Sequence, residues 1–430
     1  MVQLSKVLQE VRVTPKSVDD YIPIVGKEKI DRLKELAKPL KNKKVLNLNT
    51  TAYGGGVAEL LKTQVALMQD LGLQVDWYVM TPVPGFFDVT KLFHNNMQGH
   101  SGTVSDEQKQ VYLNGAEVNA KGIVENYDYV IAHDPQPLAM IDYVTARTGK
   151  WIWRCHIDTS QPNADTWNFL YPYMQNYDAV VFTLDEFVKE NSEFRNLTFI
   201  PPSIDPLSPK NSEMAEEEVN NLMVSYNVDP TRPLLVQISR FDPWKDPLGV
   251  IDVYRNIKYS HSVKGIRGTQ LVLVTSMAHD DPEGWIIYDR VVRRAGEDFD
   301  LHVYTNYHNV GDVGVKAFQM AANVVLQKSL KEGFGLTVAE ALWKGKPVIG
   351  GNVGGIKLQI QDGVNGFLVS NIQEATEKTL YLLKNPDVAK KMGETGKEVV
   401  RESFLSIREI EDHLKLFNKL ADEPCTTISC

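Results

Sequence analysis

Short apolar segments that alternate with longer helical patterns most constrain how this chain of 430 residues can fold. Such apolar runs are typical of strands buried on both faces, and their alternation with helices favours a parallel sheet covered on both sides. In the first half, strands are expected at residues 45–48, 75–79, 129–132, 151–153 and 179–182, and helices at 56–72 and 138–148. This half is therefore predicted to be one doubly wound α/β domain.

A second series of the same kind follows. Its strands are expected at residues 234–238, 271–274, 301–304, 324–326, 348–349 and 367–369, with helices at 338–343 and 374–383. A proline-rich connector, Pro201–Pro206, and an acidic run, Glu213–Glu218, separate the two series, and the acidic run is expected on a solvated helix. The predicted domains are 1–210 and 211–405, with 406–430 as a terminal helix and tail that could pack back on the first domain. The fold class is α/β, with two Rossmann-like domains facing a central cleft, and ligands of such sheets bind beyond the carboxyl ends of the strands.

The charge balance and the apolar runs exclude several classes of protein. The chain has 46 Lys and Arg residues against 55 Asp and Glu residues, so its net charge is −9 and a broad nucleic-acid-binding face is not expected. No apolar run approaches the ~20 residues of a membrane-spanning helix, and the N-terminal segment lacks the apolar core of a secretory signal. Three cysteines make no disulfide scaffold; Cys425 and Cys430 could pair, but a reduced tail is expected. We expect a cytoplasmic enzyme.

A glycine-rich loop follows the first expected strand. Gly54, Gly55 and Gly56 open a helix, where small residues let a ligand approach the backbone and the helix N-terminus favours an anion. The loop is not the dinucleotide fingerprint, because Glu59 stands where that pattern requires a glycine, and no Gly-Lys-Ser/Thr of a phosphate-binding P-loop follows. It is either a tight turn or a loop that contacts the phosphate or sugar of a ligand.

Two further loops of the first half place polar residues after strands. His133 and Asp134 follow one strand, and His156 and Asp158 follow the next. A single histidine is often a structural residue, but two such loops at one sheet edge favour a ligand site. Their spacing is not that of a zinc site such as His-Glu-x-x-His.

In the second half, two cations follow the first strand. Arg240 and Lys245 stand close together just before an expected helix. Arginine binds phosphate in a bidentate fork, lysine adds a point charge, and the helix N-terminus adds partial positive charge. The pair is either two surface cations or a phosphate site.

The most informative segment contains two carboxylates. Glu332 and Glu340 flank the turn Gly333, Phe334 and Gly335, and Thr337 is expected to start a helix that carries Glu340 one turn in. A carboxylate accepts two hydrogen bonds and so suits paired sugar hydroxyls. The alternative is a glycine-rich turn with two surface carboxylates.

Taken together, these segments resemble a known family. Glu332 and Glu340, with seven residues between them, match the E-x7-E signature of retaining glycosyltransferases of family 4, which have the GT-B fold. Within that family, the chain most resembles the trehalose glycosyltransferring synthases, over nearly its whole length. The matching segments are 53–59, 89–95, 133–137, 153–158, 201–207, 239–245, 277–285 and 332–355.

The resemblance implies a reaction and roles on the donor side. It implies that glucose passes from a nucleoside diphosphate glucose, UDP-glucose or ADP-glucose, to free glucose with retention, giving α,α-trehalose in a reaction that could run both ways. By this resemblance, Arg240 and Lys245 neutralise the diphosphate. Glu340 holds the ribose hydroxyls, and Glu332 with the backbone of 333–335 holds hydroxyls of the donor glucose. The base would bind near Thr305–His308.

The resemblance also implies roles for the first half. His156 would lie beside the donor sugar, and the loop with Gly55 and Gly56 would close over diphosphate and sugar. Asp134, Asp158 and Asn95 are assigned to the acceptor glucose. No nucleophile for a double displacement stands out, so same-face attack is expected. The family also suggests a homodimer.

One departure from the family pattern concerns the cation loop. Many GT-B enzymes read Gly-Arg-x-x-x-x-Lys-Gly there, whereas here Ser239 precedes Arg240 and Asp246 follows Lys245. Both cations remain, but the missing glycine could alter how the next helix starts. The DxD motif of metal-dependent glycosyltransferases has no counterpart, since Asp280 and Asp281 lie outside the E-x7-E region; no obligatory cofactor is expected, although Mg²⁺ could accompany the nucleotide.

Three rival functions stay open. A retaining trehalose phosphorylase would use inorganic phosphate in place of the nucleotide, and Arg240 and Lys245 would suit it equally. Another family 4 transferase would use a different acceptor, as sucrose-type enzymes do. A nonenzymatic sugar-nucleotide sensor would bind the donor without turnover. The presence of both Glu332 and Glu340, together with both cations, argues against a sensor.

Overall fold

The computed structural model describes residues 7–81, 83–145, 147, 149–259, 266, 268–277 and 282–423. Contacts divide the chain into two compact units, of which the first comprises Met1–Ser203 with Ser406–Cys430 and the second Ile204–Leu405. The sequence analysis placed this division after residue 210. Cys425, Cys430, Asp280 and Asp281 lie outside the described residues, so the expectations about them stay predictions.

The first unit contains a seven-stranded sheet in the order β1-β3-β2-β4-β5-β6-β7. All neighbouring strands are parallel except β1 and β3, which pair antiparallel. The strands are β1 Leu8–Glu10, β2 Lys44–Asn49, β3 Gln74–Met80, β4 Tyr129–His133, β5 Lys150–Arg154, β6 Ala179–Phe182 and β7 Leu197–Phe199. The five strands expected from apolar runs are all present. Four of them, β2, β4, β5 and β6, could be recognised because they are buried on both faces and their sequences are almost continuously apolar.

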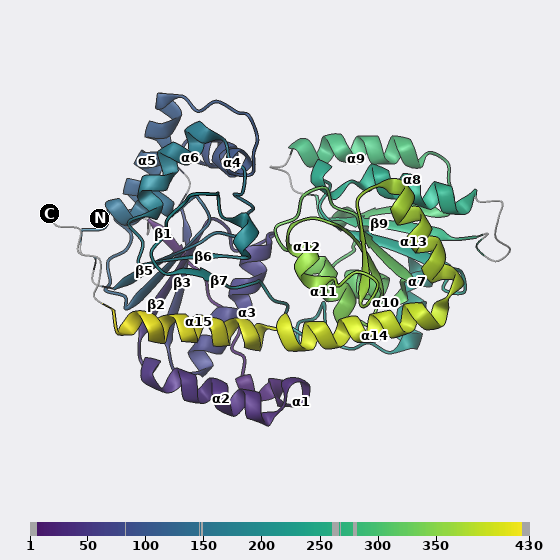
Figure 1. Ribbon diagram of the computed structural model, residues 1–430, viewed down its shortest axis with the longest axis horizontal. Helices are drawn as coiled ribbons and strands as arrows, with labels where there is room; N and C mark the ends of the chain where they lie inside the picture. The colour runs from purple at the N-terminus through teal and green to yellow at the C-terminus, as the bar shows by residue number, and fades with distance from the viewer. Residues whose placement is uncertain are drawn as a thin grey trace, which may run out of the picture. The chain divides into compact units, whose positions relative to one another are not determined.

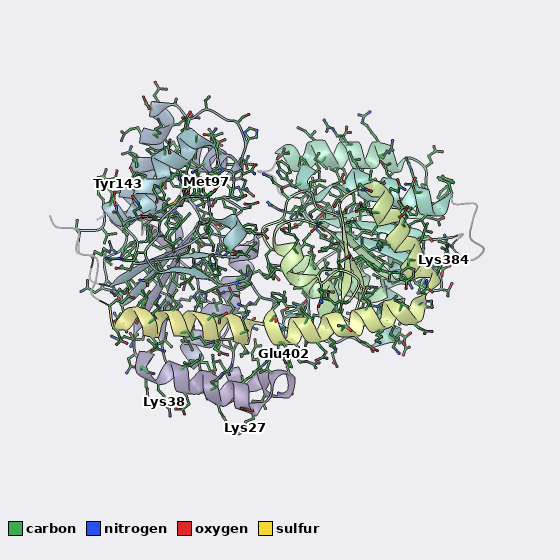
Figure 2. The ribbon with its side chains drawn as sticks, viewed as in Figure 1. Lys27, Lys38, Met97, Tyr143, Lys384 and Glu402 are labelled. Carbon is green, nitrogen blue, oxygen red and sulfur yellow. The ribbon has the colours of Figure 1, made fainter. Side chains whose placement is uncertain are left out.

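Helices cover both faces of this sheet (Figure 1). One layer contains α2 Lys27–Ala37, α3 Gly56–Asp70 and α15 Ser406–Ala421, and the other contains α4 Phe86–Met97, α5 Asp106–Ala120 and α6 Ala164–Met174. Figure 2 labels Lys27 and Lys38 beside the first layer and Met97 in the second. The terminal helix α15 belongs to this core, since Phe417 is fully buried and stacks on Tyr129 of β4 with 4.4 Å between ring centroids.

The second unit contains a six-stranded parallel sheet in the order β10-β9-β8-β11-β12-β13. Its strands are β8 Leu234–Ile238, β9 Gln270–Thr275, β10 Leu301–Thr305, β11 Val324–Gln327, β12 Val348–Gly351 and β13 Gly366–Val369. Apolar residues of α8 Pro247–Lys258, α9 Pro282–Ala295 and α13 Ile372–Lys384 share one core with the sheet. The remaining helices are α7 Glu216–Ser225, α10 Asp312–Ala321, α11 Leu336–Trp343, α12 Gly354–Gln359 and α14 Pro386–Ser403.

The strand orders fix where each unit can bind a ligand. In the first sheet, the chain runs outward from β2 to β3 on one side and from β4 to β7 on the other, so the order reverses between β2 and β4. In the second sheet, it reverses in the same way between β8 and β11. Loops that leave neighbouring strands at such a reversal diverge and open a crevice at the carboxyl edge. The glycine loop and the His133 loop leave the first reversal, and the Arg240 and Glu332 loops leave the second.

One helix prediction from the sequence is wrong. Residues 138–148 were expected to be helical, but only a single 3₁₀ turn, Leu138–Asp142, forms in the described part of this range. Tyrosine hydroxyls compete for its backbone groups: Tyr177 Oη donates to the Leu138 carbonyl at 2.8 Å, and Tyr112 Oη accepts from the Ala139 amide at 3.2 Å. The apolar run is there to fill the core beneath α5 and α6, where Leu138 and Ala139 are fully buried.

Among the residues that the structure describes, no helix is long and apolar enough to cross a membrane.

Candidate functional site

The second unit brings together one predicted cation and one predicted carboxylate. Lys245 Nζ lies 2.7 Å from Glu332 Oε1 and 2.6 Å from Glu332 Oε2, so the ammonium is shared between both oxygens. The side chains are 19% and 7% exposed, respectively. Ser329 Oγ donates to Glu332 Oε2 at 3.1 Å, which leaves the carboxylate in one orientation. A charge pair this sheltered from water is strongly attractive and strongly oriented.

Backbone contacts fix the loop that carries Lys245. Asp242 caps the 3₁₀ turn Pro243–Lys245 by accepting from the Trp244 amide at 2.7 Å. Gln237, which is buried in β8, donates from Nε2 to the Lys245 carbonyl at 2.7 Å. The Trp244 carbonyl accepts from the Leu330 amide at 2.7 Å, so the loop after β8 is tied directly to the loop after β11.

The turn between Glu332 and α11 depends on glycine. Gly335 has a φ of +84°, a left-handed conformation that side chains disfavour, and an added Cβ would lie 3.2 Å from Glu332 Cγ. At Gly355, an added Cβ would lie 2.4 Å from Phe334 Cα, so only glycine lets α12 approach the turn. Gln359 of α12 donates from Nε2 to the Phe334 carbonyl at 2.6 Å. The helix α11 starts at Leu336, one residue before the expected Thr337.

Glu340 lies in a different environment from Glu332. It is only 2% exposed, and its two oxygens have different partners: Gln319 Nε2 lies 3.1 Å from Oε2, and Lys210 Nζ lies 3.4 Å from Oε1. The E-x7-E spacing therefore yields two separate carboxylates, each beside its own lysine.

Arg240 follows β8 and the expected base loop follows β10, with β9 between these two strands in the sheet. Arg240 is exposed and has no hydrogen bond or ion pair with another residue that the structure describes. The turn Asn306–His308 follows β10, and Asn306 Oδ1 accepts from the Met277 amide at 2.8 Å, which joins the ends of β9 and β10. The structure thus leaves Arg240 available, and the Asn306 contact holds the base loop in place.

The two predicted histidines of the first unit contact each other. His133 Nδ1 lies 3.0 Å from His156 Nε2, and His133 Nε2 lies 3.1 Å from Oδ1 of Asn47, a buried residue of β2. Burial, followed by the charge of Arg154, lowers the pKa of His133 to about 3, and the same causes hold the pKa of His156 well below its usual value. Both rings are neutral at pH 7, so each can donate one hydrogen bond and accept another.

Asp134 orients the His156 loop. It has a φ of +66°, and its Oδ1 accepts from the His156 amide at 2.8 Å. Burial raises the pKa of Asp134 to about 6, although that hydrogen bond and Arg154 act in the opposite direction. The structure therefore brings Asp134, His133 and His156 together at one sheet edge.

The glycine loop lies open at the same edge. Gly54 has a φ of +77°, Gly55 is the N-cap of α3, and Gly56 is the first residue of the helix. An added Cβ at Gly54 or Gly55 would meet no other atom within 4 Å, so packing does not explain these glycines. The space above them is available to a ligand, with the amides at the start of α3 beside it.

Asp158 and Asn95 are less closely tied to this group. Asp158 Oδ1 accepts from the Ser160 amide at 2.9 Å in a local turn. Asn95 is half-buried near the end of α4, and its neighbour Asn96 accepts from the Asn163 amide at 2.8 Å. The end of α4 therefore lies beside the loop that follows β5, but among the described residues no hydrogen bond or ion pair joins Asn95 or Asp158 to His156.

A buried polar network behind the histidines was not predicted. Arg154 is 1% exposed and donates to the carbonyls of Phe182 and Ile200, and its Nη2 lies 4.0 Å from Glu409 of α15. Ser203 Oγ donates to Glu409 Oε2 at 2.5 Å. His413, also on α15, is buried, and its pKa lies well below the usual value because of burial and Arg154. The polar Asn47 within an apolar strand signals its contact with His133, but no sequence pattern marks Glu409 as the partner of Arg154.

Within the described residues, no group of three or more His, Cys, Asp or Glu side chains is arranged to hold a metal ion.

Two family models match the chain. The model for the N-terminal domain of trehalose synthase matches residues 47–189, and the model for group 1 glycosyl transferases matches residues 300–399.

Individual proteins match over most of the chain. The trehalose synthase of Pyrococcus horikoshii is 46% identical over 94% of this chain and 97% of its own length. The trehalose phosphorylase of Grifola frondosa is 29% identical over 82% of this chain but only 53% of its own. Among solved structures, a UDP-forming α,α-trehalose-phosphate synthase from Burkholderia xenovorans has a TM-score of 0.71 at 14% identity, covering 89% of this chain and all of that one. This structural likeness identifies the GT-B fold.

We expect the buried histidines to make the protein sensitive to acid. The unfolded chain binds protons on histidine below a pH of about 6.5, whereas native His133 and His413 stay neutral, so the free energy of unfolding falls as the pH drops below that value. Well below that pH, each such imidazole contributes a slope of about 1.4 kcal/mol per pH unit. Asp134 has the opposite effect on the free energy of unfolding, because its raised pKa lets the native state bind a proton before the unfolded chain does. It is one such group, whereas several histidines are buried.

Urea unfolding of His413→Leu between pH 7 and 5 tests this expectation. The variant should lose about 1 kcal/mol per pH unit of this dependence, because it removes one such imidazole and the unfolded histidine is only partly protonated near pH 7. His100→Leu, at an exposed position of the same unit, should leave the slope unchanged. Equal slopes in wild type and His413→Leu would contradict the prediction.

Proposed function

Because this chain belongs to the trehalose synthase family of GT-B glycosyltransferases, we propose that it makes α,α-trehalose from a nucleoside diphosphate glucose and free glucose. Membership of the family shows that the chain is a glycosyltransferase and that the glycosyl transfer is related to trehalose. The nucleotide donor, the retention of configuration and the direction towards synthesis are the proposal.

The observation that carries the proposal is the contact between Lys245 and Glu332. A nucleotide sugar joins a phosphate, which needs a cation, to a glucose, whose hydroxyls need acceptors, through one bond at the anomeric carbon. Lys245 and Glu332 supply one group of each kind within 2.7 Å. A donor that displaces this ion pair would give each partner a new contact, with the anomeric carbon beside both.

The other proposed donor contacts also lie in the second unit. Arg240 is exposed on the loop next to Lys245 and supplies a second cation for the diphosphate. Both cations would stabilise the charge that develops on the leaving phosphate as the sugar bond breaks. Glu340 would accept the ribose hydroxyls in exchange for its contact with Lys210, and the amide groups of Gly333–Gly335 would contact the sugar.

The first unit is proposed to contact both the donor and the acceptor. Neutral His156 is proposed to hydrogen-bond the donor sugar, and its ring is held by His133 and its backbone by Asp134. Gly55 and Gly56 are proposed to contact the diphosphate through their amides. Asp134 and Asp158, with Asn95, remain the proposed contacts of the acceptor glucose.

We expect the transfer to proceed by attack on the same face that the phosphate leaves, with the leaving phosphate oxygen accepting the acceptor's proton. Mass spectrometry of enzyme quenched during turnover with UDP-glucose should therefore find no glucosyl ester, and product analysis by NMR should find only the α,α-linkage. Recovery of a glucosylated Asp or Glu peptide would contradict this mechanism and indicate a double displacement.

Product analysis with alternative donors tests the function itself. Purified protein is incubated with glucose and either UDP-glucose or ADP-glucose, and a parallel tube contains trehalose and inorganic phosphate. We expect trehalose from a nucleotide donor and no glucose 1-phosphate in the parallel tube. Glucose 1-phosphate in the phosphate tube alone would indicate a phosphorylase, and no product in either tube would favour another acceptor or a sensor.

Removal of the cations should weaken catalysis strongly. Arg240→Ala and Lys245→Ala each remove a charge expected on the leaving diphosphate, so kcat should fall about 100-fold and the donor KM should rise. Arg290→Ala, which removes an exposed arginine of α9, is the matched control and should leave both constants unchanged. A fall in kcat below threefold for both site variants would contradict the assigned role.

A further inference from the structure

The residue after Lys245 has an unusual backbone for its type. Asp246 has φ +49° and ψ +51°, the left-handed conformation, at the point where the cation loop enters α8. A glycine adopts this conformation without steric cost, whereas an aspartate does so only where its surroundings hold it. The loop that carries Arg240 and Lys245 therefore depends on whatever holds Asp246.

The start of α8 supplies the first support. Asp246 Oδ1 accepts from the Gly249 amide at 3.1 Å and so caps the helix. The carboxylate lies so close to Gly249 that an added Cβ there would stand 2.2 Å from Asp246 Oδ2. Gly249 thus leaves the space that the Asp246 side chain occupies.

A buried lysine supplies the second support. Lys328 comes directly after β11, its side chain is 6% exposed, and its ammonium forms an ion pair with Asp246 Oδ2. An ammonium this deeply buried needs a counter-charge, and Asp246, 21% exposed, provides it. The pair therefore joins the loop after β8 to the loop after β11.

Each member of this pair is a sequence neighbour of the donor machinery. Asp246 follows Lys245, and Lys328 precedes Ser329, whose hydroxyl donates to Glu332 at 3.1 Å. We propose that the Asp246–Lys328 ion pair positions Lys245 and Glu332 for the donor, so that both members act as positioning residues. This inference rests on the proposed function, because it assigns the donor to the Lys245–Glu332 pair.

The test compares three variants with a matched control. Asp246→Asn keeps a cap that tolerates the left-handed conformation but removes the charge, and Lys328→Met keeps the stem but removes the ammonium. The double variant removes both charges. Lys258→Met is the control, because Lys258 lies at the other end of α8 and pairs with Asp298 at 2.5 Å, far along the helix from the donor loops.

We expect each single variant to raise the Kd for UDP, measured by calorimetry, and the donor KM by about tenfold, since a small displacement of positioned groups costs this much. The acceptor KM should stay within about twofold. The double variant should be no worse than the more impaired single variant, because neither charge is then left unpaired. Lys258→Met should lower the melting temperature but leave the Kd and the donor KM unchanged.

Several outcomes would overturn the inference. Unchanged donor constants in both single variants would do so, as would single-variant effects that multiply in the double variant, or equal increases in donor and acceptor KM. If Lys328→Met does not fold, Asp246→Asn alone decides through its Kd for UDP.

The wild-type chain separates this inference from the proposed function. Trehalose formation by the wild type, with unaffected variants, would overturn only the positioning role. Binding of UDP or ADP without trehalose would overturn the proposed function, and the variant Kd values would still decide the positioning role. Absence of both binding and turnover in the wild type would overturn both.

Discussion

The ion pair between Lys245 and Glu332 is the interaction on which the geometry of the second unit's site depends. It joins loops that leave two neighbouring strands, β8 and β11, where the strand order reverses and the loops would otherwise diverge. The surrounding contacts all restrict these same two loops: Gln237 holds the Lys245 carbonyl, Ser329 holds the Glu332 carboxylate, and a backbone hydrogen bond joins Trp244 to Leu330. The glycines at 335 and 355 are needed because the turn is packed too closely for a Cβ.

Most of the fold could be predicted from the sequence because the strands are buried on both faces. Such strands read as uninterrupted apolar runs, and their alternation with helices leaves few topologies. The prediction failed where tertiary contacts replaced local ones, as at Leu138–Asp142, where tyrosine hydroxyls satisfy backbone groups that a helix would have used. The short edge strands β1 and β7 were both missed, because Leu8 is the only buried residue among the six that form them and neither strand has a buried apolar run to detect.

The site was predictable as a set of loops but not as a set of contacts. Post-strand position and the E-x7-E spacing identified Lys245 and Glu332, and the structure joins them. The same spacing could not indicate that Glu340 is buried beside Lys210 rather than next to Glu332. In each unit, partners from distant parts of the sequence were missed: Lys328 pairs with Asp246 in the second unit, and Glu409 lies beside Arg154 in the first. A single lysine or glutamate in a helix or loop carries no pattern that reveals such a contact.

The pre-formed charge pair also bears on which ligand suits the second unit. A phosphate that binds Lys245 must compete with Glu332, so it gains only the difference between two charge-assisted contacts and leaves a buried carboxylate without its counter-ion. A ligand that carries phosphate and sugar hydroxyls on adjacent atoms replaces both halves of the pair at once. Phosphate alone should therefore bind weakly, and the combined group strongly, without any additional residue to discriminate between them. With the proposed donor, the Lys245–Glu332 pair would therefore couple recognition of the leaving group to recognition of the sugar that it leaves, which is the coupling that transfer of a glucosyl group requires.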